Sequence, residues 1–274
     1  MGGFTFCCGD FVAAMDAKGT VTNEILEMIE EDSRVCYINS DSTVGRVAEA
    51  MKKYPDRVLD TGIQEMNMVT VAAGLAKMGY IPFVQTFGPF LCVRALDQIH
   101  NDVCYNDFPV RLIGTHAGLS SGYGPTHNTI IEFGIMNAMP NMTMVAPCDA
   151  NQAKKLLRKS LNYPGPIYIR IPRGEEPAVY DEGFEYEYEI GKAVEISEGK
   201  DLTIIATGMA VYNSVKAAMK LQEQGYDIGV IDMHTIKPID KELVAASAKK
   251  TGKVVTVEEH SIIGGLGSAV CEAL

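Results

Sequence analysis

Three residues of this chain combine a reactive side chain with an unusual setting. Glu65 is the only charged residue in the apolar run 65–76, EMNMVTVAAGLA, and it stands at the start of that run. His116 and His127 lie in the glycine-rich segment GTHAGLSSGYGPTH, residues 114–127. Imidazole takes up and returns protons near neutral pH, and a buried carboxylate can do the same. These residue types predict a site that moves protons, provided that the fold brings them together.

The run that begins at Glu65 has the composition of a buried helix. A helix without a polar face is buried on several sides, so a carboxylate in its first turn lies in the interior or in an interface. Glu65 is then either paired or functional. The alternative is that Glu65 only complements the positive end of the helix dipole, which is worth about 0.3–1 kcal/mol. The residues themselves leave both interpretations open.

The segment with the two histidines follows a predicted strand. In an open α/β sheet, ligands bind in loops at the carboxyl ends of the strands. Glycines at positions 118, 122 and 124 let the backbone approach a ligand closely, and Pro125 stiffens the end of the loop. The alternative is that two histidines share this loop by coincidence.

Further residues could contribute to a site. Phe87 and Phe90, in QTFGPFLCV, lie at a strand-to-helix turn and either pack in the core or line a pocket. Arg94 follows them and is left without a role, since it could be a charge on the helix surface. Asp41 follows a strand and either caps the next helix or contacts a ligand.

Two arginines end the last strand of the first part of the chain, in YIRIPRGEEP. Arg170 and Arg173 could clamp a phosphate group, because a guanidinium group binds phosphate through two hydrogen bonds. The alternative is that they pair with Glu175 and Glu176.

The elements that would position these residues follow a regular order. Strands are predicted at 35–39, 81–86, 110–115, 142–146 and 167–171, and helices at 43–53, 65–78, 90–104, 130–139 and 151–162. Strands separated by helices, with apolar runs that hardly alternate, indicate a parallel sheet covered on both faces. We therefore predict a doubly wound α/β domain over residues 1–175.

An acidic, aromatic stretch interrupts this order and is predicted to be a linker over residues 176–190. A second alternation occupies residues 191–274, with strands at 202–206, 228–233 and 254–258 and helices at 211–224 and 241–250. A glycine turn then opens an apolar helix in SIIGGLGSAVCEAL, which ends without a cap. We expect a second, smaller α/β domain that is truncated at its carboxyl end.

Composition argues against several classes of protein. The hydrophobic fraction of 47% and the charged fraction of 22% are those of a soluble globular protein. A net charge of −11 argues against binding to nucleic acid, and no run reaches the roughly 18 apolar residues that would span a membrane. The seven cysteines lack metal-binding spacing, and the first residues lack a secretory signal. We expect no metal site in this chain and a reduced, cytoplasmic protein.

Two of these segments carry a resemblance to a known family. GIQEMNMVTVAAGLA resembles the cofactor-activating segment of the transketolase family of thiamine diphosphate enzymes, and GPTH with an upstream TH is similar to that family's histidine loop. The resemblance implies that Glu65 bonds the cofactor's aminopyrimidine ring and favours its imino tautomer. It implies that Phe87 and Phe90 receive this ring, and that His116 and His127 steer the protons of substrate hydroxyls.

The resemblance extends to residues that would bind the rest of the substrate and cofactor. It implies that Arg170 grips the phosphate of a sugar phosphate, and Lys18 stands near the place of another phosphate-binding arginine. Asp41 corresponds to a residue that approaches the cofactor from the neighbouring subunit. The chain departs from the family at Tyr123, where sugar-phosphate transketolases usually have an aspartate, so the donor preference stays open.

The family's motif for binding magnesium and diphosphate, G-D-G followed by an asparagine, has no counterpart in this chain, because Gly9–Asp10 lacks the second glycine. Magnesium needs several well-placed oxygen ligands. We therefore expect the Mg²⁺ ligands to come from an N-terminal transketolase subunit that carries the diphosphate-binding domain. The resemblance implies homodimerisation of this chain within a heterotetramer whose sites lie between subunits.

The implied reaction is transfer of a two-carbon glycolaldehyde unit from a ketose phosphate to an aldose phosphate. One alternative is the carboxyl half of a 1-deoxyxylulose-5-phosphate synthase, which normally carries an arginine in place of His116. Another is the β subunit of a 2-oxo acid dehydrogenase, which lacks the paired-histidine loop. The last is a non-catalytic scaffold, which has no reason to keep Glu65.

Overall fold

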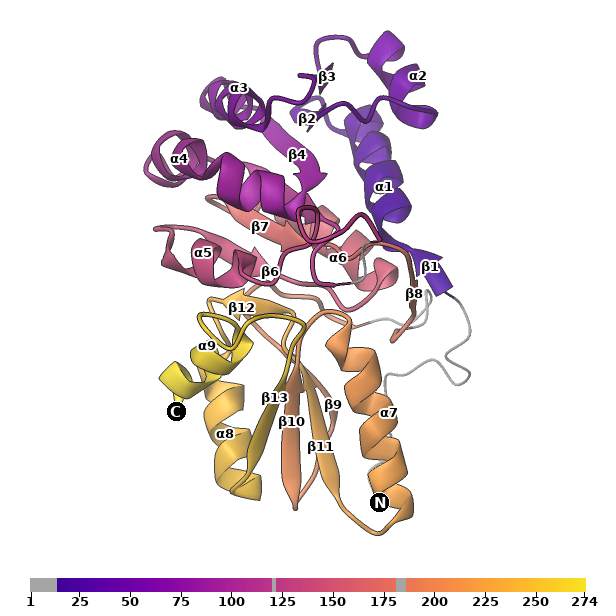
Figure 1. Ribbon diagram of the computed structural model, residues 1–274, viewed down its shortest axis with the longest axis vertical. Helices are drawn as coiled ribbons and strands as arrows, with labels where there is room; N and C mark the ends of the chain where they lie inside the picture. Colours follow the sequence, from indigo (N-terminus) through magenta and orange to yellow (C-terminus); the bar gives the residue numbers. More distant parts are fainter. Residues whose placement is uncertain (1–13, 120–121, 181–185) are drawn as a thin grey trace.

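The first domain is built on a seven-stranded sheet (Figure 1). The computed structural model describes residues 14–119, 122–180 and 186–274, so the Gly9–Asp10 pair lies outside the described residues. The strand order is β12-β6-β7-β5-β4-β2-β3, and every pair is parallel except β12 with β6. The strands are β2 (Val35–Asn39), β3 (Val58–Asp60), β4 (Ile81–Phe87), β5 (Arg111–Thr115), β6 (Thr143–Val145), β7 (Ile167–Arg170) and β12 (Thr235–Lys237).

Helices cover both faces of this sheet. One face packs against α1 (Ala17–Glu31), α2 (Arg46–Lys53) and α6 (Ala150–Ser160). The other face packs against α3 (Glu65–Lys77), η1 (Phe90–Arg94), α4 (Leu96–Gln98), η2 (Ile99–Cys104) and α5 (Glu132–Ala138). Because both faces are covered, all the residues of β2 and β5 are buried, which explains why these runs do not alternate. The predicted doubly wound α/β fold is confirmed.

The chain reverses its direction of winding beside β2. From β2 it passes through α2 to the edge strand β3, and it then returns through α3 to β4 on the other side of β2. In open α/β sheets the crevice at such a switch point, outside the carboxyl ends of the strands, is the usual ligand site. Asp41, Phe87 and His116 all lie at or just beyond these strand ends. The topology therefore gathers residues that are far apart in the sequence.

The second domain has a smaller sheet of order β13-β10-β11-β9, shown below the first domain in Figure 1. Its strands are β9 (Val194–Ser197), β10 (Leu202–Ala206), β11 (Ile228–Asp232) and β13 (Val254–Val257), and its helices are α7 (Ala210–Glu223), α8 (Lys241–Thr251) and α9 (Leu266–Ala273). Strand β9 is antiparallel to β11. The predicted second, smaller α/β unit is confirmed. Among the described residues, no helix is long and apolar enough to cross a membrane.

Several elements escaped the sequence prediction. Helix α1 was not predicted, although Val21, Ile25 and Met28 repeat on one buried face with helical spacing. The strand pair β1 (Ala14–Asp16) and β8 (Glu175–Pro177) is too short to give a periodic signal. Strand β12 belongs by sequence to the second domain but completes the first sheet, so the two domains share a strand pairing.

A buried polar network also joins the two domains. Asp232, at the end of β11, accepts hydrogen bonds through Oδ2 from Nε2 of Gln152 in α6 at 2.6 Å and from the hydroxyl of Tyr180 at 2.8 Å. All three side chains are buried. Burial raises the pKa of the Asp232 carboxyl to about 7. The network can therefore hold a proton at this carboxyl under mildly acidic conditions.

We predict that Asp232→Asn makes the stability of the chain less dependent on pH. Because the pKa of Asp232 is about 7 in the folded chain and about 3.9 in the unfolded chain, the folded chain holds an extra proton between these values. The contribution of this group to stability is thus fully present below about pH 4 and is lost as the pH rises through about 7. In urea titrations between pH 5 and pH 8, the free energy of unfolding of the wild type should fall by about 1–3 kcal/mol relative to that of Asp232→Asn.

The matched control is Asp56→Asn, which changes an exposed aspartate in the turn before β3. This variant should follow the wild-type pH profile. If Asp232→Asn also followed the wild-type pH profile, the prediction would be wrong. The pKa of Asp232 would then be the same in the folded and the unfolded chain.

Candidate functional site

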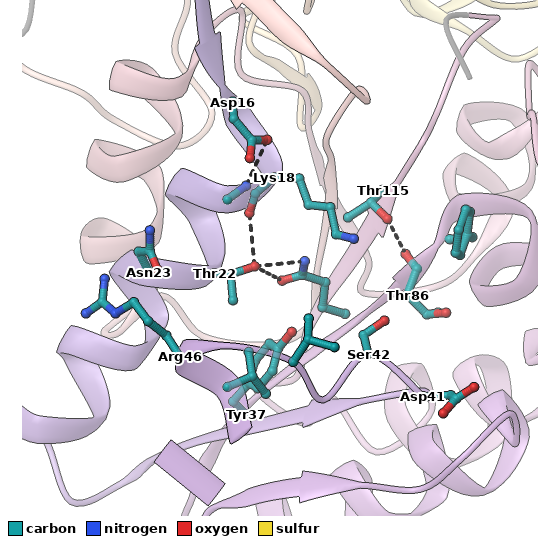
Figure 2. Close-up of a pocket in the computed structure, with 15 residues that line it drawn as sticks. Asp16, Lys18, Thr22, Asn23, Tyr37, Asp41, Ser42, Arg46, Thr86 and Thr115 are labelled. Atoms are coloured by element: carbon teal, nitrogen blue, oxygen red, sulfur yellow. Dashed lines mark hydrogen bonds between the residues drawn. The ribbon is translucent and has the colours of Figure 1, made fainter. Parts of the chain in front are cut away.

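A pocket of about 500 Å³ opens beside the carboxyl ends of β2, β4 and β5 (Figure 2). Lys18 at the start of α1, Asp41 after β2, Phe87 at the end of β4 and Thr115 at the end of β5 all line it. Polar side chains from α1 and β4, such as Thr22 and Gln85, bond to each other across its wall. The pocket lies at the switch point of the sheet, where the topology predicts a ligand.

The two histidines pack around Phe87 next to this pocket. The ring of His116 stacks on Phe87 at 4.0 Å between centroids, and His127 meets Phe87 edge-on at 5.3 Å. Phe90 lies 5.5 Å from Phe87 and 5.0 Å from His127. Tyr123 closes the group at 5.8 Å from each histidine ring. The structure thus brings both predicted histidines and both predicted aromatics into one cluster.

His116 is held in an unusual environment. Its backbone adopts a left-handed conformation with φ of 58°, and its side chain is buried. The Thr115 hydroxyl lies 2.9 Å from its Nδ1. Burial, followed by the positive charges of Lys18 and Arg173, lowers the pKa of His116 to about 4. At neutral pH this imidazole is therefore uncharged, with its free nitrogen able to accept or donate a proton.

Glu65 begins helix α3 and is 1% exposed. Its Oε2 accepts a hydrogen bond from Nη1 of Arg94 at 2.7 Å, and the Ser40 hydroxyl lies 3.4 Å from Oε1. The same Arg94 guanidinium lies over the ring of Phe90 at 4.3 Å. The carboxylate is therefore buried and paired, and its place in the first turn of α3 also suits the helix dipole.

Arg94 is a functional candidate to which the sequence alone assigned no role. It lies in η1, where irregular helical geometry turns its side chain back over Phe90 toward α3. The spacing of Phe90 and Arg94 on one helical stretch was the only available signal for this contact.

Asp41 lies at the rim of the pocket and does not cap a helix. Helix α2 begins at Arg46 with Gly45 in the capping position and no side-chain cap, so the capping interpretation of Asp41 is wrong. The backbone amide of Asp41 donates to Oδ1 of Asp60 at 3.0 Å. Its φ of 51° leaves the side chain exposed beside the pocket. Such left-handed backbone at a non-glycine residue is common at functional sites.

Arg170 is placed in the domain junction, away from the pocket lining. Its side chain is 2% exposed, and its Nε donates to Oε1 of Glu132 at 2.6 Å. Its Nη2 donates to the backbone carbonyl of Glu259 at 2.7 Å. The partners of Arg170 are therefore Glu132 and Glu259, and Glu176 is not among its salt bridges. The predicted phosphate-binding role of this residue has no support from its contacts.

Arg173 lies nearer the histidines than Arg170 does. Its guanidinium packs over the Tyr123 ring at 4.3 Å, and its Nη2 donates to the Tyr123 hydroxyl at 3.1 Å. Its charge acts on His116 together with that of Lys18. Lys18 and Arg173 thus bring two positive charges to His116 from opposite ends of the domain sequence. In the part of the chain that the structure describes, no group of three or more His, Cys, Asp or Glu side chains could hold a metal ion.

Two protein families match this chain in consecutive segments. Residues 13–177 match the family described as transketolase, pyrimidine binding domain. Residues 191–274 match the family described as transketolase, C-terminal domain.

Individual relatives cover nearly the whole chain. One of the subunits of the apulose-4-phosphate transketolase of Phocaeicola vulgatus is 37% identical over 262 residues, which are 94% of this chain and 83% of that protein. A 1-deoxy-D-xylulose-5-phosphate synthase of Cyanothece sp. is 40% identical over 254 residues, which are 91% of this chain but 40% of that protein. A solved structure described as a split gene transketolase, inactive beta4 tetramer, has a TM-score of 0.87 and 37% identity, covering 94% of this chain and 84% of its own.

We predict that His116 stays neutral well below neutral pH. Its pKa of about 4 results from burial and from two neighbouring cations, so Lys18→Met should raise the pKa by removing one of them. The ring Cε1–H signals of the isolated chain, assigned with His116→Gln, should show no titration of His116 between pH 8 and about pH 5.

Lys220→Met, which removes an exposed charge from α7, is the control and should leave the His116 titration unchanged. A His116 midpoint near the ordinary value of about 6.5 would contradict the predicted environment.

Proposed function

Because this chain belongs to the transketolase family, we propose that it is the C-terminal subunit of a split, thiamine diphosphate-dependent transketolase. The proposed reaction moves a two-carbon glycolaldehyde unit from a ketose phosphate to an aldose phosphate. The observation that carries this proposal is the cluster at the switch point. There Phe87, which lines the pocket, packs with Phe90, His116 and His127, and Arg94 links Phe90 to the buried Glu65.

The described residues fit the pyrimidine half of the cofactor. Glu65 is a buried carboxylate at a helix start, and the Ser40 hydroxyl lies 3.4 Å from its Oε1. Phe87 and Phe90 offer apolar ring surface next to it, which suits an aromatic ring that carries polar nitrogens. When bound, thiamine diphosphate supplies the electron sink for cleavage of a carbon–carbon bond. Glu65 would hold the pyrimidine ring and share a proton with it.

The histidines would handle protons at the substrate. A neutral His116 can accept the proton of a substrate hydroxyl and return it in the reverse direction. His127, half-buried on the other side of Phe87, can donate to an oxygen on which negative charge develops. The rings of Phe90 and Tyr123 pack against His127 on this side of the cluster.

We assign the substrate's phosphate to Lys18 and Arg173 in place of Arg170. Lys18 lines the pocket and Arg173 lies on Tyr123 beside the histidines, whereas the Arg170 guanidinium is buried and bound to Glu132. A phosphate needs cations that can reach it in the pocket. This assignment follows the electrostatics of the site, because both cations already act on His116.

A partner subunit would complete the site. Magnesium requires several oxygen ligands, so the proposal assigns its binding and that of the diphosphate to an N-terminal subunit. The Phocaeicola relative is named as one subunit of its transketolase, and the split-gene relative is described as inactive in its beta4 form. These descriptions support a chain that pairs with itself and with a second kind of subunit, as in a heterotetramer.

A 1-deoxyxylulose-5-phosphate synthase activity is the second candidate, because such a synthase matches 91% of this chain. His116 argues against it, since the synthase family normally carries an arginine there. The chain spans 40% of that synthase and 83% of the Phocaeicola relative.

We predict that transketolase activity requires both this chain and the matching N-terminal subunit. Xylulose 5-phosphate and ribose 5-phosphate, with thiamine diphosphate and Mg²⁺, should react only when the two subunits are mixed. Glu65→Gln should lower kcat about 10²–10⁴-fold, because an amide cannot exchange the proton.

Glu49→Gln, on the exposed side of α2, is the matched control and should retain wild-type activity. Product from pyruvate and glyceraldehyde 3-phosphate, with none from the sugar phosphates, would instead establish the synthase. If Glu65→Gln kept both the transketolase activity and the synthase activity, that result would contradict the proposed site.

A further inference from the structure

The Arg94 side chain contacts both groups that a bound pyrimidine ring would use, the Glu65 carboxylate and the Phe90 ring. The Arg94 guanidinium binds Oε2 of Glu65 at 2.7 Å and lies over the Phe90 ring at 4.3 Å. Phe90 meets its other ring neighbours, Phe87 and His127, in tilted or edge-on geometry. Arg94 therefore covers part of the Phe90 ring and links that ring to Glu65 through this side chain.

The burial of the two partners is strongly unequal. The side chain of Glu65 is 1% exposed, whereas that of Arg94 is 41% exposed. A buried carboxylate without a counter-ion is costly, so the free chain gains from this pairing. Once a ligand takes over the pairing of Glu65, the arginine can leave toward solvent, where its charge is already partly hydrated.

We infer that Arg94 is a latch that closes the pyrimidine site until the cofactor displaces it. In the latched form the guanidinium stands in for the ring by neutralising Glu65 and covering Phe90. In the open form the arginine turns outward, and Glu65 faces the cofactor. This inference rests on the proposed function, since it concerns how the same site receives its cofactor.

The latch lowers the apparent affinity for the cofactor in proportion to its occupancy. If about 90% of the chains are latched, the apparent Kd is about tenfold larger than the intrinsic value. Removal of the guanidinium should then tighten cofactor binding, although it removes a charged residue from the site. A residue that merely supported the site would give the opposite result when removed.

The test uses the complex reconstituted with the matching N-terminal subunit and measures thiamine diphosphate binding by calorimetry in the presence of Mg²⁺. Arg94→Met should bind the cofactor about five- to tenfold more tightly than wild type. Arg94→Gln, which keeps a hydrogen-bond donor for Glu65 and so protects folding, should also bind more tightly. Arg34→Met removes an arginine paired with Asp32 away from the pocket and should bind as the wild type does.

A second readout does not depend on the cofactor. In the isolated chain, Arg94→Met should lower the thermal midpoint, and Glu65→Gln in the same chain should restore it, because the amide no longer needs a counter-ion. Unchanged or weaker cofactor binding by both Arg94 variants would overturn the latch while leaving the proposed function in place. Absence of binding by every complex, the wild type included, would overturn the proposed function and the latch together.

Discussion

The buried ion pair between Arg170 and Glu132 is the interaction on which the site depends most. Both side chains are at most 2% exposed, so their charges are stable only while each holds the other. Arg170 extends from the end of β7 and also bonds the backbone of Glu259 in the second domain. Glu259 in turn accepts a hydrogen bond from the backbone amide of Leu119, in the loop between the two histidines. The second domain therefore fixes the loop that carries the proposed proton chemistry.

The second domain supports the histidine loop of the first domain. Strand β12 extends the first sheet, and Asp232 bonds Gln152 across the junction. A loop that must hold His116 in a left-handed conformation needs support from several sides, because that conformation is unfavourable for a non-glycine residue. The support comes from backbone and carboxylate contacts that only form when both domains are folded. Site geometry and domain packing are thus coupled through the same few hydrogen bonds.

Local charge in the site runs against the charge of the chain. The chain carries a net charge of −11, yet Lys18 lines the pocket, Arg173 lies on Tyr123 beside the histidines, and Arg94 pairs with Glu65. These cations keep His116 neutral and compensate Glu65, and they would attract an anionic substrate at the same time. The buried carboxylate of Glu65 has Arg94 as its counter-ion.

The α/β order, the burial of Glu65 and the position of the histidine loop after a strand could all be predicted from the sequence. These features follow from apolar periodicity and from the types of a few neighbouring residues, which are local properties. Three other features could be learned only from the folded chain: β12 joins the first sheet, Arg170 lies in the domain junction, and Arg94 binds Glu65. Each of these depends on contacts between residues far apart in the chain or on the direction of a long side chain. A single sequence gives no signal for either, because many partners of suitable charge are available until packing selects one.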